Sequence, residues 1–238
     1  MSLTLHWNGR TYPFEAPDDA RGSEHHDAYV DKRLHKNVHL IRSGMLGGKP
    51  TRQLVLKIGY DDEDIAALEK EAKLYRDQLK PLQGKHIPFF FGIFHGQVED
   101  QDAACILLEY CAGGGQMTYP EMNRQIMLAA CAIHAVGLMH CALLHRPQHL
   151  ILSGKSVKIV DFSHAEPHRC VGATPTLYPG MGGDATGCLE LVGLEACYGV
   201  FSGERIPEAR PSRPPSRAAD GGPLQVLARR VGGYMTFQ

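Results

Sequence analysis

The first half of the chain alternates between apolar runs of strand length and short polar turns. Residues 38–46 (VHLIRSGML) and 53–58 (QLVLKI) are apolar or alternating, and Gly and Pro residues separate them. This pattern predicts a β-hairpin. Two further β-rich runs, IPFFFGIFHG and AACILLEYC, flank the polar stretch QVEDQD. We therefore expect antiparallel strands over most of this half.

Helical spacing is present in both halves. The first helix is expected after the acidic run DDED, because acids favour a helix N-terminus, and Pro81 should end it. Its apolar face consists of Ile65, Leu68, Ala72, Tyr75 and Leu79. A second helix should begin at the capping-box spacing Thr118 to Glu121. Residues 149–162 (HLILSGKSVKIVDF) predict another hairpin, and residues 189–201 predict a further buried helix.

The two ends of the chain differ from the middle. Residues 1–37 are polar and mixed with little periodicity, so they form a poorly defined N-terminal segment. Residues 203–238 begin with a stretch dominated by Arg, Pro, Ser and Gly. Such a composition cannot bury enough apolar area to offset its ordering entropy, so we expect a disordered tail.

Composition narrows the classes of function. The chain has 238 residues, 43% hydrophobic residues and a formal net charge of −1, which exclude wholesale disorder and a strong overall field for nucleic acid or membranes. We therefore expect neither nucleic acid nor a membrane as a partner. Seven cysteines without a CxxC pair favour a reducing compartment, and no signal peptide or membrane-spanning run is visible. These features predict a soluble intracellular protein, cytoplasmic or nuclear.

The order of these elements resembles that of the protein kinase fold. Lys57 in LVLKI is similar to the strand lysine that holds nucleotide phosphates in that family, and Glu71 in EKEAKLY to its helix partner. In LLEYC, Leu108 corresponds to the gatekeeper, and Glu109 and Cys111 to hinge positions. VKIVDFSHA resembles the metal-binding segment, with Asp161 as the magnesium ligand and Ser163 in place of a glycine.

The resemblance implies a fold class and domain boundaries. It implies an α+β, bilobal protein kinase-like fold, with an antiparallel small lobe carrying one helix and a shortened, mainly helical second lobe. The small lobe would span residues 38–112 and the large lobe residues 113–202. The residues DFSHA at this motif and the short length of the chain resemble those of kinase-like proteins of fungi.

The catalytic loop departs from that family. His140 matches the motif histidine, but the aspartate position holds Ala142, or Leu144 if the loop is counted back from the following strand. Residues 140–160 contain no Asp, Glu or Asn in either register. The phosphate-covering loop is also missing, because Gly44, Gly47 and Gly48 do not spell its motif and are better placed to turn the hairpin.

These departures favour loss of catalysis. The leading hypothesis is a pseudokinase with weak ATP and magnesium binding and a binding or regulatory role toward an unidentified protein partner. An active, atypical ATP-dependent phosphotransferase is the alternative, because phosphoryl transfer depends strongly on electrostatics. A decayed remnant without selected activity is a third. Whether the chain is an enzyme is left open, with the balance toward inactivity.

Histidine is abundant, with 13 residues in the chain. His164, His168 and Cys170 form one local group, and His145 and His149 another. A zinc site needs four converging ligands. None of the sequence clusters supplies four in a recognised spacing, so the sequence predicts no structural metal.

Overall fold

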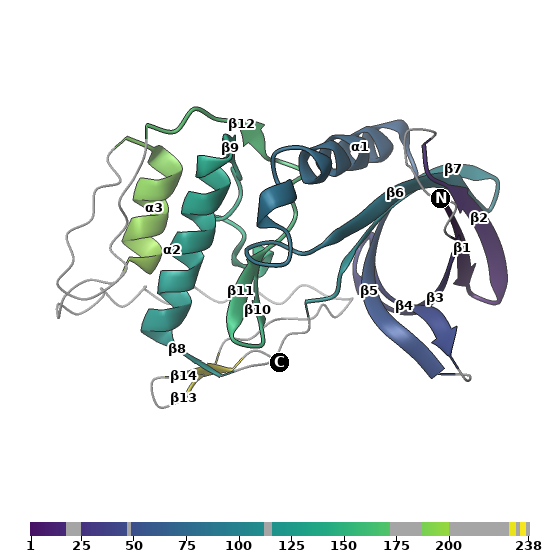
Figure 1. The fold of residues 1–238 in the computed structure, drawn as a ribbon, viewed down its shortest axis with the longest axis horizontal. Coiled ribbons are helices and arrows are strands. Elements are labelled where there is room, and N and C mark those ends of the chain that lie inside the picture. The colour runs from purple at the N-terminus through teal and green to yellow at the C-terminus, as the bar shows by residue number, and fades with distance from the viewer. Residues whose placement is uncertain are drawn as a thin grey trace, which may run out of the picture.

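A computed structural model describes residues 1–17, 25–46, 49–111, 116–171 and 187–199, together with short strands at 229–231 and 234–236. Its largest feature is a closed β-barrel of seven strands (Figure 1). The strands are β1 (Ser2–Trp7), β2 (Arg10–Glu15), β3 (His25–His35), β4 (Val38–Leu46), β5 (Lys49–Gly59), β6 (Phe90–Val98) and β7 (Gln101–Glu109). Around the barrel they follow the order β1-β2-β6-β7-β5-β4-β3.

The closed barrel corrects the predicted fold class. The bilobal kinase-like fold is wrong, because residues 1–37 supply three strands that join the ends of the expected open sheet. Strand β2 pairs with β6, and β1 pairs in parallel with β3, which closes the circle. The polar composition hid β2 and β3, because each exposes most of its side chains and therefore lacks a clear alternation.

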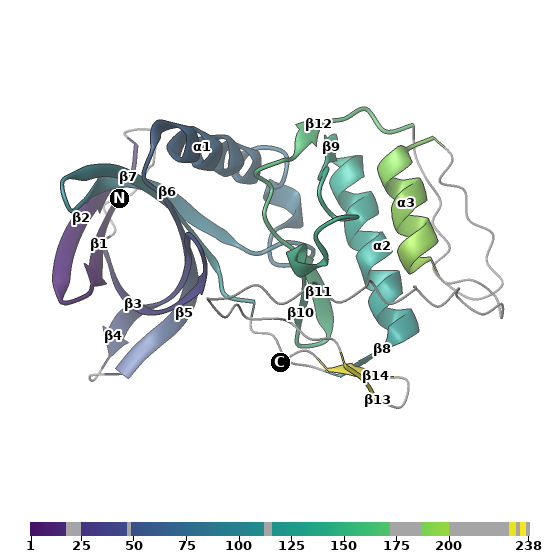
Figure 2. The ribbon, with the colours of Figure 1, turned by 180° about the vertical axis from the view of Figure 1, so that it is seen from behind.

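Three α-helices occur in the described part of the chain, at the predicted places. They are α1 (Asp62–Arg76), α2 (Tyr119–Ala135) and α3 (Leu189–Tyr198). Helix α1 lies against the outer wall of the barrel, whereas α2 and α3 pack side by side at the opposite end of the molecule (Figure 2). Asp61 caps α1 by accepting a hydrogen bond from the Asp64 amide. None of the described helices has the length and apolar character needed to cross a bilayer.

Smaller elements connect these parts. The predicted hairpins are confirmed: β4 pairs with β5, and β10 (Leu150–Ser153) pairs with β11 (Ser156–Ile159). The remaining elements are η1 (Lys80–Leu82), η2 (Pro147–His149), β8 (Met117–Thr118), β9 (Leu138–Met139), β12 (Glu166–Pro167), β13 (Arg229–Val231) and β14 (Tyr234–Thr236). Most of the predicted disordered tail and the glycines 47–48 lie outside the described residues.

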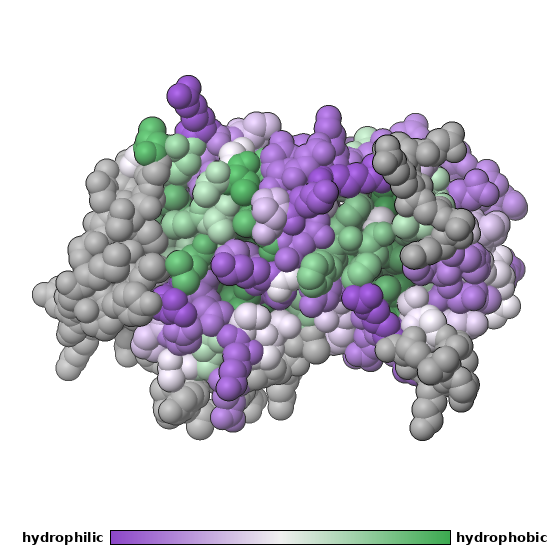
Figure 3. Space-filling model, viewed as in Figure 1, coloured by the Kyte–Doolittle hydropathy of each residue, from purple (hydrophilic) through white to green (hydrophobic). Residues whose placement is uncertain are grey.

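Two cores share the barrel wall. In β5, Leu54, Leu56 and Ile58 point into the barrel, whereas Val55 and Lys57 face outward. Strand β7 is apolar on both faces: Cys105 and Leu107 fill the barrel, and its alternate residues pack under α1. The apolar interior is visible through the open end of the barrel, ringed by hydrophilic residues (Figure 3). Successive side chains of a strand point to opposite faces, and this alternation decides which β5 side chains meet α1.

Candidate functional site

Lys57 lies on the outward face of β5 and points toward α1. Its Nζ donates a hydrogen bond to Oε2 of Glu71 at 2.6 Å. Glu71 belongs to the buried face of α1 with Leu68, Ala72 and Tyr75, which explains why a carboxylate reaches the barrel wall. Because Glu71 is fully buried, it needs this ammonium as a charge partner.

Asp161 completes the cluster from a segment more than 100 residues further along the chain. Lys57 Nζ donates to Asp161 Oδ1 at 2.8 Å, and the Ser163 hydroxyl donates to the same oxygen at 2.8 Å. The other oxygen, Oδ2, lies 3.2 Å from His149 Nε2. The Phe162 amide donates to Glu71 Oε1 and fixes the segment to α1. We call Lys57, Glu71, Asp161, His149 and Ser163 the charged cluster.

The backbone at Asp161 is strained. Its φ is +67°, in the left-handed region that a non-glycine residue rarely adopts. Such strain costs on the order of 1–3 kcal/mol and persists where surrounding contacts hold the residue in place. The contacts to Lys57, His149 and Ser163 do so here. The chain therefore maintains the carboxylate in a defined direction at an energetic cost, which is common at binding sites.

Electrostatics keep both central groups charged. Burial alone would raise the pKa of Asp161, but the hydrogen bonds from His149, Lys57 and Ser163 and the ammonium charge hold that pKa far below its usual range. Burial lowers the pKa of Lys57, yet the carboxylates of Glu71 and Asp161 outweigh it and raise that pKa. The side chains of Lys57 and Asp161 keep 21% and 28% exposure, so solvent and small ligands can reach them.

The loop between α2 and β10 brings no acid to the charged cluster. Ala142 is buried, and Leu144 is partly exposed and packs near Gly193 of α3. His140 is fully buried, with Nε2 bonded to the Val160 carbonyl at 3.0 Å. Burial lowers the pKa of His140. The loop therefore supplies a histidine, His149, but no carboxylate at the site where Asp161 is held.

An acid from α3 does reach this loop, and the sequence reasoning missed it. Glu190 accepts hydrogen bonds from the backbone amides of His140 and Cys141, at 3.1 and 2.7 Å, and lies 2.8 Å from His134 Nε2. It is buried and turned toward the backbone. The available signal was an acid, Glu190, in the first turn of a mostly apolar helical run.

The residues compared with a hinge have structural contacts. Leu108 packs in the core beside α1. Glu109 Oε2 accepts the Phe89 amide at 3.0 Å and lies 3.7 Å from Lys158 Nζ. Cys111 is buried, which with the nearby Glu109 charge raises the pKa of its thiol to about 12. The structure thus brings Lys57, Glu71 and Asp161 together. The three residues compared with the gatekeeper and hinge have partners elsewhere.

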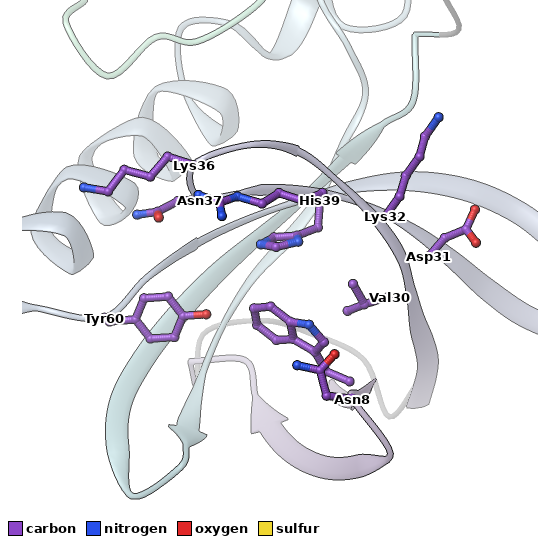
Figure 4. A pocket seen from close by; sticks show the side chains of 10 residues that line it. Asn8, Val30, Asp31, Lys32, Lys36, Asn37, His39 and Tyr60 are labelled. Carbon is purple, nitrogen blue, oxygen red and sulfur yellow. The ribbon is translucent and has the colours of Figure 1, made fainter. Parts of the chain in front are cut away.

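A separate hollow opens on the barrel. It has a volume of about 520 Å³ and contains none of the sequence-predicted site residues. His39 and Tyr60 are directed into the hollow, while Lys32 and Lys36 extend from its rim (Figure 4). The Trp7 and His39 rings meet edge to face, with centroids 4.7 Å apart. Because these residues come from several strands, no local sequence pattern indicates the hollow.

The fold and the site define a class of protein: a closed seven-stranded β-barrel with helices packed on one side and a partly buried Lys–carboxylate cluster at their junction. No protein-family model matches the chain, and no curated protein matches it in sequence. The descriptions protein kinase, pseudokinase, ATP-binding protein and transferase rested on the family resemblance. They are therefore withdrawn together with the fold.

Proposed function

We propose that the chain is a non-catalytic binding module whose charged cluster holds a phosphate-bearing ligand weakly, together with Mg²⁺. The observation that carries the proposal is the Lys57 ammonium held between Glu71 and the strained Asp161. An ammonium is a point charge suited to phosphate oxygens, and a carboxylate is a ligand that Mg²⁺ prefers. A nucleotide is the phosphate ester with which the proposal is tested.

Weak affinity follows from the contacts that a ligand must replace. Both oxygens of Asp161 already have partners, Lys57 and Ser163 on Oδ1 and His149 on Oδ2. A cation at Asp161 displaces at least one of them, so part of the binding energy is spent on rearrangement. A binding rather than catalytic role is supported by the carboxylates of the charged cluster, because both oxygens of Glu71 and both oxygens of Asp161 already have partners and neither group is free to act as a general base.

The test is a thermal-unfolding titration of the full chain with Mg²⁺ and ATP. Binding to the folded state alone stabilises it by about 2.7 kcal/mol at a ligand concentration 100 times Kd. For a chain of this size, that raises the unfolding midpoint by about 5–11 °C. The rise should need Mg²⁺ and should disappear in Asp161→Asn, which preserves the shape of the side chain. Lys73→Ala, an exposed lysine on the same helix as Glu71, should keep it.

Two results would overturn the proposal. The absence of any Mg²⁺-dependent rise in the wild-type protein would make the charged cluster a structural ion-pair network. Transfer of radiolabelled phosphate to the chain or to a generic acceptor, lost in Asp161→Asn, would show that the module is catalytic. Lys57→Met is a poorer probe, because it leaves Glu71 buried without a charge partner at a cost of about 3–5 kcal/mol.

A further inference from the structure

Four metal-ligating side chains converge away from the charged cluster, where three segments meet. They are His134, His168, Cys170 and Cys188, and their ligand atoms all lie within 4.8 Å of one another. His134 is in the last turn of α2, His168 and Cys170 follow β12, and Cys188 directly precedes α3. The sequence could not show this set because Cys188 is 54 residues from His134.

We propose that these four residues form a structural zinc site. Two thiolates and two imidazoles are a ligand set that Zn²⁺ binds tetrahedrally. Zinc bonds of about 2.0–2.3 Å place neighbouring ligand atoms roughly 3.3–3.8 Å apart. The observed separations are all within 4.8 Å, about 1 Å beyond the upper end of that range. Four protein ligands fill the coordination shell, so the site supports folding and leaves no open position for catalysis.

The surroundings of both histidines support this assignment. His134 directs Nε2 to the Glu190 carboxylate at 2.8 Å and Nδ1 toward Cys188 Sγ at 3.6 Å. Zinc-bound histidines characteristically give their second nitrogen to a carboxylate, which fixes the ring and raises its basicity. Nε2 of His168 is buried and has no hydrogen-bond partner among the described residues. Such an unpartnered buried nitrogen is costly unless an ion or water satisfies it.

Binding of Zn²⁺ releases protons and leaves the site without a net charge. The thiols of Cys170 and Cys188 each lose a proton to solvent, and the two thiolates neutralise Zn²⁺. All seven cysteines lie in described residues and none is in a disulfide, so both thiols are available. Helix α3 has only ten residues, and Cys188 at its N-cap makes no side-chain cap bond. A metal bond at Cys188 anchors a helix that is too short to be stable alone.

Metal content of the full-length chain tests the site directly. Protein purified without a metal-affinity tag should contain about one zinc ion per chain by elemental analysis. Exchange with Co²⁺ should give the thiolate charge-transfer absorption of a tetrahedral site. Cys188→Ser should lose the ion, whereas Cys197→Ser, an exposed cysteine on the same helix, should retain it. His168→Ala should also lose it, with His164→Ala as the matched control.

Metal content and the Co²⁺ spectrum of the wild-type protein decide the question even if a ligand variant fails to fold. A wild-type chain with no stoichiometric zinc that also takes up no Co²⁺ would overturn the site. So would a Cys170–Cys188 disulfide in protein alkylated at lysis, or equal metal loss in Cys188→Ser and Cys197→Ser. None of these measurements depends on nucleotide binding, so this site and the proposed function stand or fall separately.

Discussion

At the scale of single residues, charge and burial explain why Lys57, Glu71 and Asp161 meet. The resemblance to the kinase family singled them out, and in the structure the buried Glu71 carboxylate needs the partly exposed Lys57 ammonium as its charge partner. The contact of His149 with Asp161 and the position of Glu190 depend on how separate segments pack. Local patterns do not carry that information, so these two contacts could not be predicted.

His140 should make stability depend on pH near neutrality. Its folded pKa lies below the ordinary value of 6.5 because burial disfavours the charged ring. The unfolded chain therefore takes up the proton first, and stability falls as pH drops below 6.5. When the pH falls from 7.5 to 5.5, the free energy of unfolding should decrease in both proteins. The decrease should be smaller in His140→Gln than in the wild type, by up to about 1.4 kcal/mol. Urea unfolding at both pH values measures this.

His145→Gln is the matched control for this prediction, because His145 is exposed in the same loop. It should keep the wild-type pH dependence. His39 and His86 have pKa values lowered by burial as well, so some acid-side slope should remain in every variant. If His140→Gln and the wild type lose equal stability over this pH range, then His140 does not carry the charge change.

At the scale of elements, the sequence was most informative where apolar spacing was strong. The three helices and both hairpins with clear turns were predicted close to their observed positions. Strand β7, apolar on both faces, was recognisable from its continuous run. Strands β2 and β3 were not, because a barrel strand with many exposed side chains resembles a polar loop in composition. Strand β1 was missed as well, although its buried residues Leu3 and Leu5 alternate with less buried ones.

The cap of α1 should contribute measurably to stability. The Asp61 carboxylate accepts the Asp64 amide at 2.7 Å and satisfies an otherwise unpaired donor at the helix start. Asp61→Ala should therefore lower the free energy of unfolding by about 1 kcal/mol in a denaturant titration. Asp61→Asn keeps an accepting oxygen and should cost only a few tenths. Equal losses in the two variants would contradict a capping role.

At the scale of the whole molecule, closure of the barrel decides the fold class. The elements between residues 38 and 165 are compatible with an open sheet, and only the pairing of β2 with β6 and of β1 with β3 excludes it. Strands β2 and β6 are far apart in the sequence, and β3 has no clear alternation of apolar and polar residues. The fold class was therefore wrong although most of the elements were right, because strand partners are set by tertiary packing.

Phe14 tests whether the N-terminal strands are a full part of the core. It is 1% exposed, lies on β2 and fills the barrel interior. Phe14→Ala should lower the free energy of unfolding by about 3–5 kcal/mol, because it leaves a cavity. Thr11→Ala, an exposed position on the same strand, should cost less than about 0.5 kcal/mol. A Phe14→Ala variant as stable as Thr11→Ala would contradict the closed barrel.

The pairing of Phe14 with Gly96 has a consequence for synthesis of the chain. Strand β2 leaves the ribosome before its partner β6, which follows about 80 residues later. At 5–20 residues per second, β2 waits roughly 4–16 s with one unpaired edge. During that interval the unpaired edge of β2 can pair with other strands, so rapid synthesis of this chain favours shielding of that edge by a chaperone.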